Sequence, residues 1–292
     1  MMLLPPAKDR VSLFWVKLFV ALLAATVLPI GIHTVMLDVM GIPYPSAFPK
    51  NGWASFPDHV LIVLGVLYLD AVLWRDPRPL SATRRIFFLF LTLAAINQAL
   101  FRLPVMLNAV STRWTIYPFL DNLPEVLRYA VITTLVVAVG RMASTVMRKI
   151  AAATLIALAT YKVVAPWLST VFASMVAVDQ QREGDQLYNV PYDWHVNLPS
   201  YVIYLEPALA ALSVALLLGQ RRLSSIAITA IIFSIQGGPF FGTFLNSLYA
   251  SSGPGLALLS KGQFTLEALA LALLTSATSV MLIRKQLVSS QG

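Results

Sequence analysis

The chain contains no cysteine, few charged residues and only three histidines. Its 292 residues are 58% hydrophobic and 12% charged, and its mean hydropathy is +0.75. The absence of cysteine excludes disulfides, thiolate metal ligands and thiol catalysis. A soluble domain of this length carries far more charge, so the composition predicts a polytopic membrane protein.

The signatures of common soluble enzymes are also missing. The sequence has no zinc-binding HExxH motif, no Walker loop, no dinucleotide-binding glycine pattern and no nucleophile elbow. We therefore predict no cofactor. His33, His59 and His195 lie near acidic residues, but their spacing matches no ligand pattern for zinc or copper, so we predict no metal site.

Long apolar runs are the main positive feature. A helix needs roughly 20 apolar residues to cross a hydrocarbon core of ~30 Å. Eight runs fit: 13–32, 57–74, 86–106, 125–142, 150–178, 200–219, 226–249 and 263–283. The runs are continuous and not alternating, which favours helices over strands. The predicted fold class is all-α, with eight transmembrane helices.

The basic residues predict the orientation. With the N-terminus inside, the inner loops hold thirteen Lys and Arg residues and the outer loops hold four. This asymmetry predicts that both termini are cytoplasmic. It also explains the net charge of +8, so we predict no nucleic-acid partner. The Ala-rich helices and the lack of cysteine favour a bacterial inner (plasma) membrane.

Two stretches of the chain recur 142 positions further on. Residues 56–61 return as 198–203, and the stretch at Glu125 returns at Glu267. Both halves enter from the cytoplasm, so the recurrence predicts two parallel four-helix repeats, 1–142 and 143–292, within one membrane domain. Repeated membrane halves often hold a ligand on the axis between them.

The seventh apolar run contains Gly237-Gly238-Pro239 halfway along. Proline removes a helix hydrogen bond and glycine permits close approach of another backbone, so we expect a broken or kinked helix. The break is interpreted either as a packing kink or as backbone that is open to a ligand.

Polar side chains inside the apolar runs are the candidate binding residues, because they are costly to insert and usually face a bundle interior or a cavity. Gln98 and Arg102 are four residues apart and share one helical face. Glu125, Glu206 and Glu267 lie in other runs. These residues form either ion pairs between helices, such as Arg102 with Glu206, or a polar pocket that opens toward the outer leaflet.

Lys162 lies deep in the fifth run, about a dozen residues from Lys149. A charge at this depth requires a partner or a cavity. We expect Lys162 to pair, with Asp70 as the candidate, or to line a cavity.

Four short motifs lie in the first half: Leu28-Pro29-Ile30 followed by Leu37-Asp38; Arg75-Asp76-Pro77; Gln98-Ala99-Leu100-Phe101-Arg102-Leu103-Pro104; and Trp114 with Tyr129 and Thr133-Thr134. In order, they resemble the first helix, the Asp-Pro after the second helix, the third-helix pattern and the fourth helix of the EXPERA family, which includes emopamil-binding protein and the sigma-2 receptor. The family's unit is a four-helix module, and some members carry two.

The resemblance implies that Asp38, Asp76, Gln98 and Arg102 line or support a cavity for a sterol-like or cationic amphiphilic ligand. The chain departs from the family in that Gln98 replaces its ligand-facing Glu and Arg102 replaces its Gln. A sterol isomerase needs a titratable acid and base, and neither residue provides one at neutral pH. The substitutions therefore favour binding or transfer over isomerisation.

Three functions follow from these observations. The first is binding or transfer of a hydrophobic or amphiphilic small molecule, sterol- or isoprenoid-like, in an intramembrane cavity. Its predicted ligand-binding residues are Asp38, Asp76, Gln98, Arg102, Glu125, Glu206 and Glu267. The alternatives are an integral membrane enzyme acting on a lipid or isoprenoid, and a non-catalytic subunit or assembly factor of a membrane complex. Membrane lipids are expected partners in all three, and a homo-oligomer or a larger complex stays open.

Overall fold

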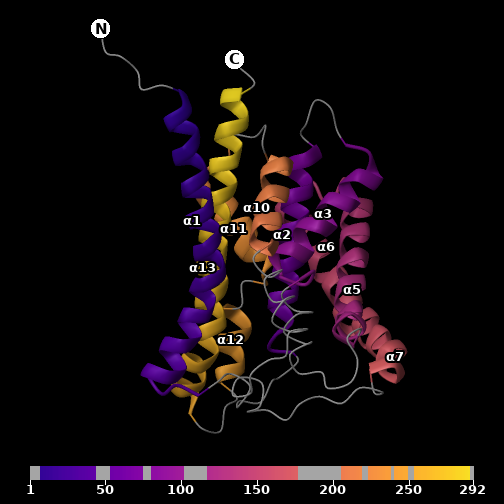
Figure 1. Cartoon of the computed structure of the whole chain (residues 1–292). Helices are drawn as coiled ribbons and strands as arrows, with labels where there is room; N and C mark the ends of the chain where they lie inside the picture. The colour runs from indigo at the N-terminus through magenta and orange to yellow at the C-terminus, as the bar shows by residue number, and fades with distance from the viewer. Residues whose placement is uncertain are drawn as a thin grey trace.

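The chain folds into a bundle of helices that run in alternating directions (Figure 1). The computed structural model describes residues 7–43, 53–74, 80–101, 117–176, 205–218, 223–237, 240–248 and 253–289. Within these ranges the structure is helical and contains no strand. The predicted all-α fold class is therefore confirmed.

The helices follow one another in this order: α1 (Ala7–Thr34), η1 (Val35–Val39), α2 (Phe56–Trp74), α3 (Ala82–Ile96), α5 (Tyr117–Val139), α6 (Val146–Ala159), η3 (Thr160–Val164), α7 (Ala165–Val176), α10 (Leu205–Leu218), α11 (Ser225–Ile235), α12 (Phe240–Ser247) and α13 (Pro254–Ser289). The η segments are π-helical turns, each continuous with the α-helix before it. The start of α1 and the end of α13 lie at the same end of the bundle (Figure 1).

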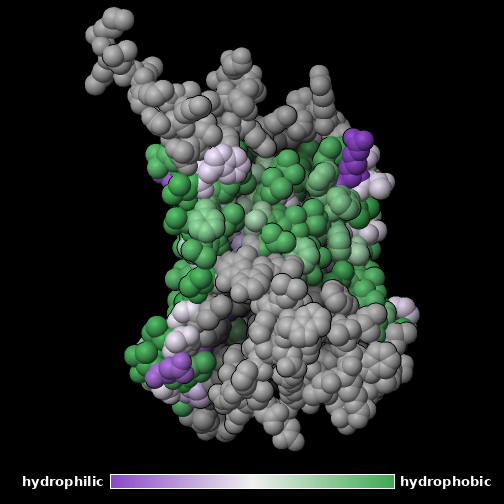
Figure 2. Space-filling view, viewed as in Figure 1, coloured by the Kyte–Doolittle hydropathy of each residue, from purple (hydrophilic) through white to green (hydrophobic). Residues whose placement is uncertain are grey.

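Four helices of the described chain are long and apolar enough to cross a membrane: Phe56–Trp74, Asn122–Val139, Val146–Ala173 and Pro254–Ile283. Shorter apolar helices cover Leu13–Ala25, Leu205–Leu218 and Ser225–Ile235. Hydrophobic residues cover most of the described surface in the upper part of the bundle (Figure 2). Length, composition and surface together indicate a helical membrane protein.

The third apolar run does not form the continuous helix predicted over 86–106. Helix α3 ends at Ile96, and residues 97–101 form a turn in which Gln98 has a φ of +57°. A positive φ is rare for a residue other than glycine and terminates the helix. At this break, the side-chain amide of Asn97 donates a hydrogen bond to the Ile235 carbonyl of α11, at 3.0 Å. The prediction failed because the contacts that stabilise this break come from other helices, which the local hydrophobic pattern does not reveal.

The predicted break in the seventh run is confirmed. Helix α11 ends at Ile235, Gly237 has a φ of +87°, and α12 begins at Phe240. A left-handed glycine after the last helical turn is a common helix terminator. Gly238 and Pro239 lie outside the described residues.

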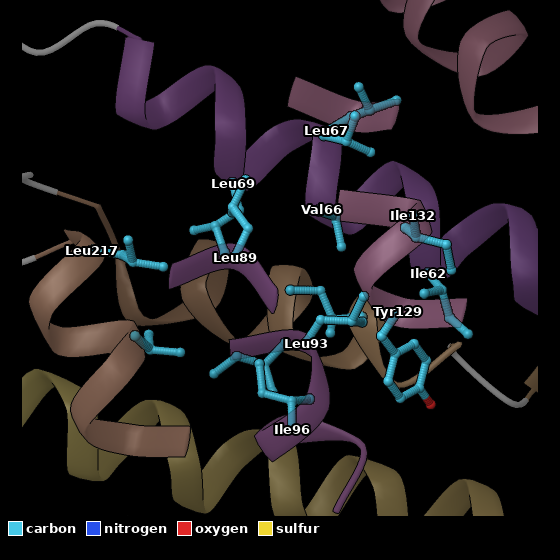
Figure 3. Packing of buried hydrophobic residues seen from close by; sticks show 14 of the residues in the cluster. Ile62, Val66, Leu67, Leu69, Leu89, Leu93, Ile96, Tyr129, Ile132 and Leu217 are labelled. Carbon is cyan, nitrogen blue, oxygen red and sulfur yellow. The ribbon is translucent and has the colours of Figure 1, made fainter. Parts of the chain in front are cut away.

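Helices distant in the sequence pack against one another around an apolar core. Helix α2 packs on α11, and α10 packs on α3. Helix α5 packs on α3 and α2, and α13 packs on α11 and α10. Helix α1 lies against α13 and α10, whereas α6 lies against α2 and α5. Side chains from α2, α3, α5 and α10 meet in the core, where Leu89 and Leu93 of α3 are almost fully buried (Figure 3).

Helices α2 and α11 approach closely at Gly65. A Cβ added there would lie 2.9 Å from Ile235 Cγ1 and 3.0 Å from the Ile235 nitrogen. We expect Gly65→Ala to force the two helices apart and to lower the free energy of unfolding by about 1–3 kcal/mol. Thermal unfolding in detergent measures this change. Gly31→Ala is the control, because a Cβ on Gly31 meets no described atom within 4 Å; equal stability of the two variants would contradict the close approach.

Candidate functional site

Aromatic and charged side chains gather where α2, α5 and η3 meet. We call this group the aromatic–cation cluster, and its members are Trp53, His59, Glu125, Arg128, Tyr161 and Lys162. His59 comes from the first turn of α2, and Glu125 and Arg128 lie one turn apart on α5. Tyr161 and Lys162 come from η3, and Trp53 comes from the turn before α2. Apart from Trp53, the members of the cluster thus come from three separate helices and converge in an apolar bundle.

The imidazole of His59 links α2 to the other two helices. It stacks on the Tyr161 ring with a centroid separation of 3.8 Å and an angle of 28°. Its Nδ1 lies 3.4 Å from Nη1 of Arg128. A guanidinium donates hydrogen bonds and does not accept them, so Nδ1 is the acceptor and the proton of the ring sits on Nε2. The arrangement therefore holds His59 as the neutral Nε2–H tautomer.

Arg128 is nearly buried, with 6% of its surface exposed. Its Nη2 donates to the Glu125 carboxylate and forms an ion pair with it. The guanidinium also lies over the Tyr129 ring, 5.4 Å from its centroid. Its Nε is buried and has no hydrogen-bond partner among the described residues. Arg128 is thus held in place by one carboxylate while part of its donor capacity stays unused.

The ammonium of Lys162 lies over two aromatic rings. Its Nζ is 4.0 Å from the Trp53 ring centroid and 4.7 Å from that of Tyr161. These are cation–π distances. The predicted pairing with Asp70 is wrong, because Asp70 forms its ion pair with Arg85. No carboxylate of the described residues forms an ion pair with Lys162.

The π-helical turn explains how η3 presents these two side chains. The N–H of Ala165 donates to the Thr160 carbonyl, five residues earlier. Pro166 follows at once; it has no N–H, and its ring would clash with a carbonyl one ordinary turn before it. The wider turn relieves that clash and shifts the helical faces on either side of it. Single π turns of this kind occur frequently at functional sites.

Two carboxylates bind backbone amides that follow a helix break. Glu206, fully buried at the start of α10, accepts from the amides of Leu100 at 2.8 Å and Phe101 at 3.3 Å, just after α3 ends. Asp58, in the first turn of α2, accepts from the Gly242 amide of α12 at 3.0 Å. We call Asp58 and Glu206 the break-capping carboxylates. A Cβ on Gly242 would overlap the Asp58 carboxylate, so only glycine permits this contact.

A third polar group lies near the opposite end of α2. Asp70 and Arg85 are both buried, and Arg85 reaches Asp70 through Nε at 3.0 Å and through Nη2 at 2.5 and 2.6 Å. The Trp74 ring lies between two guanidinium groups, 3.9 Å from that of Arg85 and 3.7 Å from that of Arg141. This two-pronged ion pair joins α2 to α3 and satisfies both charges within the protein.

The predicted site residues do not form one group. Glu125 belongs to the aromatic–cation cluster, and Glu206 and Gln98 both lie at the break of α3. Asp38 is exposed on η1, and Glu267 is half-buried on α13. Asp76 and Arg102 lie outside the described residues, and so does the predicted pairing of Arg102 with Glu206.

The sequence prediction missed Tyr161 and Trp53 as contacts of the half-buried Lys162 cation, and it missed the ion pair of Asp70 with Arg85. The signal that could have indicated this ion pair was an acidic residue inside the second apolar run and a basic residue immediately before the third. No comparable signal singles out Tyr161 among the ten tyrosines of the chain. Within the described residues, no group of three or more His, Asp or Glu side chains is placed to hold a metal ion.

No protein-family model, curated protein or solved structure matches the chain.

Proposed function

We propose that the chain crosses the membrane eight times, as two parallel four-helix halves with both termini in the cytoplasm of a bacterial inner membrane. The alternating helix directions and the common end of α1 and α13 support this topology (Figure 1). In this arrangement two of the eight spans are broken. They are the third, which contains α3, and the seventh, which contains α11 and α12. The end of η3 and the whole of α7, which follow Lys162, continue the fifth span toward the outer surface.

The pattern of helix packing supports the division of the chain into two repeated halves. The packing of α2 on α11 has its counterpart in that of α10 on α3, and the packing of α5 on α3 in that of α13 on α11. Helix α1 of the first half lies on α13 and α10, as α6 of the second half lies on α5 and α2. Asp58 and Glu206 have corresponding roles, because each caps a break in the other half. This exchange is expected of a two-fold axis along the membrane normal.

Within this frame, the protein binds or transfers an amphiphilic small molecule at the aromatic–cation cluster. The observation that carries the proposal is the convergence of a nearly buried Arg128, a half-buried Lys162 and two aromatic rings inside an apolar bundle. Charged side chains at such positions are expensive and commonly mark a substrate or ion pathway. The resemblance to the EXPERA family favours the same general class of ligand.

Arg128 has no polar counterpart at the equivalent position in the second half of the chain. The 142-residue correspondence that matches Glu125 with Glu267 matches Arg128 with Ala270. If Arg128 served only to hold the helices together, the equivalent position would need a similar group. The asymmetry therefore favours a ligand-binding role for Arg128.

The test is native mass spectrometry of the protein, extracted gently from its own membranes, with identification of bound small molecules. We expect a stoichiometric amphiphile that is retained by Arg141→Gln and lost from Arg128→Gln. Arg141 is the matched control, because its guanidinium also lies over an aromatic ring but is exposed and outside the cluster. Retention of the amphiphile by Arg128→Gln would contradict the site. A stoichiometric protein partner with only bulk lipid would favour a subunit of a larger complex instead.

A further inference from the structure

The charges of the aromatic–cation cluster do not balance among the described residues. Arg128 and Lys162 are cationic, His59 is neutral, and Glu125 is the carboxylate that pairs with Arg128. This leaves the charge of Lys162 without an anionic partner in the described part of the chain. A half-buried, uncompensated charge in a membrane helix is costly.

The two aromatic rings stabilise the Lys162 cation, but among the described residues they leave its hydrogen-bonding capacity unused. An ammonium carries three N–H donors. The Trp53 and Tyr161 rings lie against it, and no oxygen of the described residues accepts a hydrogen bond from Nζ. An anionic oxygen would use these donors and neutralise the charge at once.

Exposed apolar side chains flank Lys162. Trp53 is 64% exposed, and Val163 of η3 and Trp167 of α7 are 65% and 63% exposed. These apolar side chains offer a surface on which an alkyl or prenyl chain can lie. A free anion gains nothing from that surface, whereas an amphiphile gains hydrophobic burial along it.

We propose that Lys162, supported by Arg128, binds the anionic headgroup, a phosphate or a carboxylate, of an amphiphile whose apolar chain lies along the exposed side of η3 and α7. The inference rests on the proposed function and adds the charge of the ligand. A cationic amphiphile is disfavoured at this position, because it would meet two cations.

The test uses the full chain in phosphatidylcholine nanodiscs and three probes: dodecyl phosphate, dodecanoate and dodecyltrimethylammonium. We expect saturable binding of the two anionic probes, and Lys162→Gln should weaken it roughly 10-fold or more, the value of one charge-assisted hydrogen bond. Lys17→Gln should bind as the unmodified protein does. Lys17 is the matched control, because it lies in an apolar helix but is exposed. Lys162→Arg keeps the charge and should retain most of the binding.

The outcomes distinguish a wrong assignment of the headgroup charge from a failure of the proposed amphiphile binding itself. Binding of the trimethylammonium probe without binding of the anionic probes would overturn the anionic assignment and leave amphiphile binding intact. Absence of binding for all three probes would overturn both proposals. Equal affinity of Lys162→Gln and Lys17→Gln for dodecyl phosphate would also overturn the role of Lys162. Displacement of dodecyl phosphate by inorganic phosphate at equal concentration would overturn the part assigned to the apolar chain.

Discussion

Arg85→Met is expected to lower the free energy of unfolding by about 3–5 kcal/mol, the largest effect among the substitutions considered. The change leaves the Asp70 carboxylate buried without its cation, and an uncompensated buried charge costs this much in proteins. Both side chains are almost completely inaccessible, with exposures of 1% for Arg85 and 0% for Asp70. Chemical or thermal unfolding in detergent measures the loss.

A second substitution on the same background tests the cause. Asp70→Leu combined with Arg85→Met replaces both charges with apolar groups, which often stabilises a buried site relative to the single change. We expect the double variant to recover most of the stability that Arg85→Met loses. If it is as unstable as the sum of its two single variants, packing and not charge accounts for the effect.

Glu206→Ala is expected to destabilise the protein by about 3 kcal/mol. The carboxylate of Glu206 accepts two hydrogen bonds from backbone amides of the α3 break, at 2.8 and 3.3 Å. Its removal leaves both amides without this acceptor, and an unsatisfied buried donor costs about 1–3 kcal/mol. Glu206→Gln keeps one acceptor oxygen and should lose less.

The same unfolding assay applies, and Asp38→Asn is the control. Asp38 is an exposed carboxylate on η1, so its replacement should change stability by less than about 0.5 kcal/mol. Equal stability of Glu206→Ala and Asp38→Asn would show that the α3 break does not depend on Glu206.

The apolar runs were sufficient to predict an all-helical membrane protein, because helix length and continuous hydrophobicity are local properties. The break after Ile235 was also predictable, since Gly237 supplies a positive φ at no steric cost. The break after Ile96 was not, because Gln98 has no local preference for a φ of +57°. Its stabilising groups, Glu206 and the side chain of Asn122, come from other helices.

The candidate site was likewise predictable only in part. The cost of burying charge identified Lys162 and Glu125 individually as residues that need an explanation. It did not identify their partners, because these depend on the rotation and height of each helix in the bundle. Lys162 was expected near Asp70 but lies over aromatic rings instead, and Asp70 is satisfied by Arg85 of the adjacent helix.

The break-capping carboxylates have a consequence for how the protein is made. Glu206 binds amides that precede it by 106 and 105 residues, and Asp58 binds an amide 184 residues further on. A ribosome adds about 5–20 residues per second, so Leu100 and Phe101 wait roughly 5–20 s for their acceptor to be synthesised. During that interval the early helices enter the bilayer with polar backbone that only the later helices satisfy. We therefore expect the insertion machinery, water or lipid headgroups to shelter the amides of Leu100 and Phe101 until Glu206 has been synthesised.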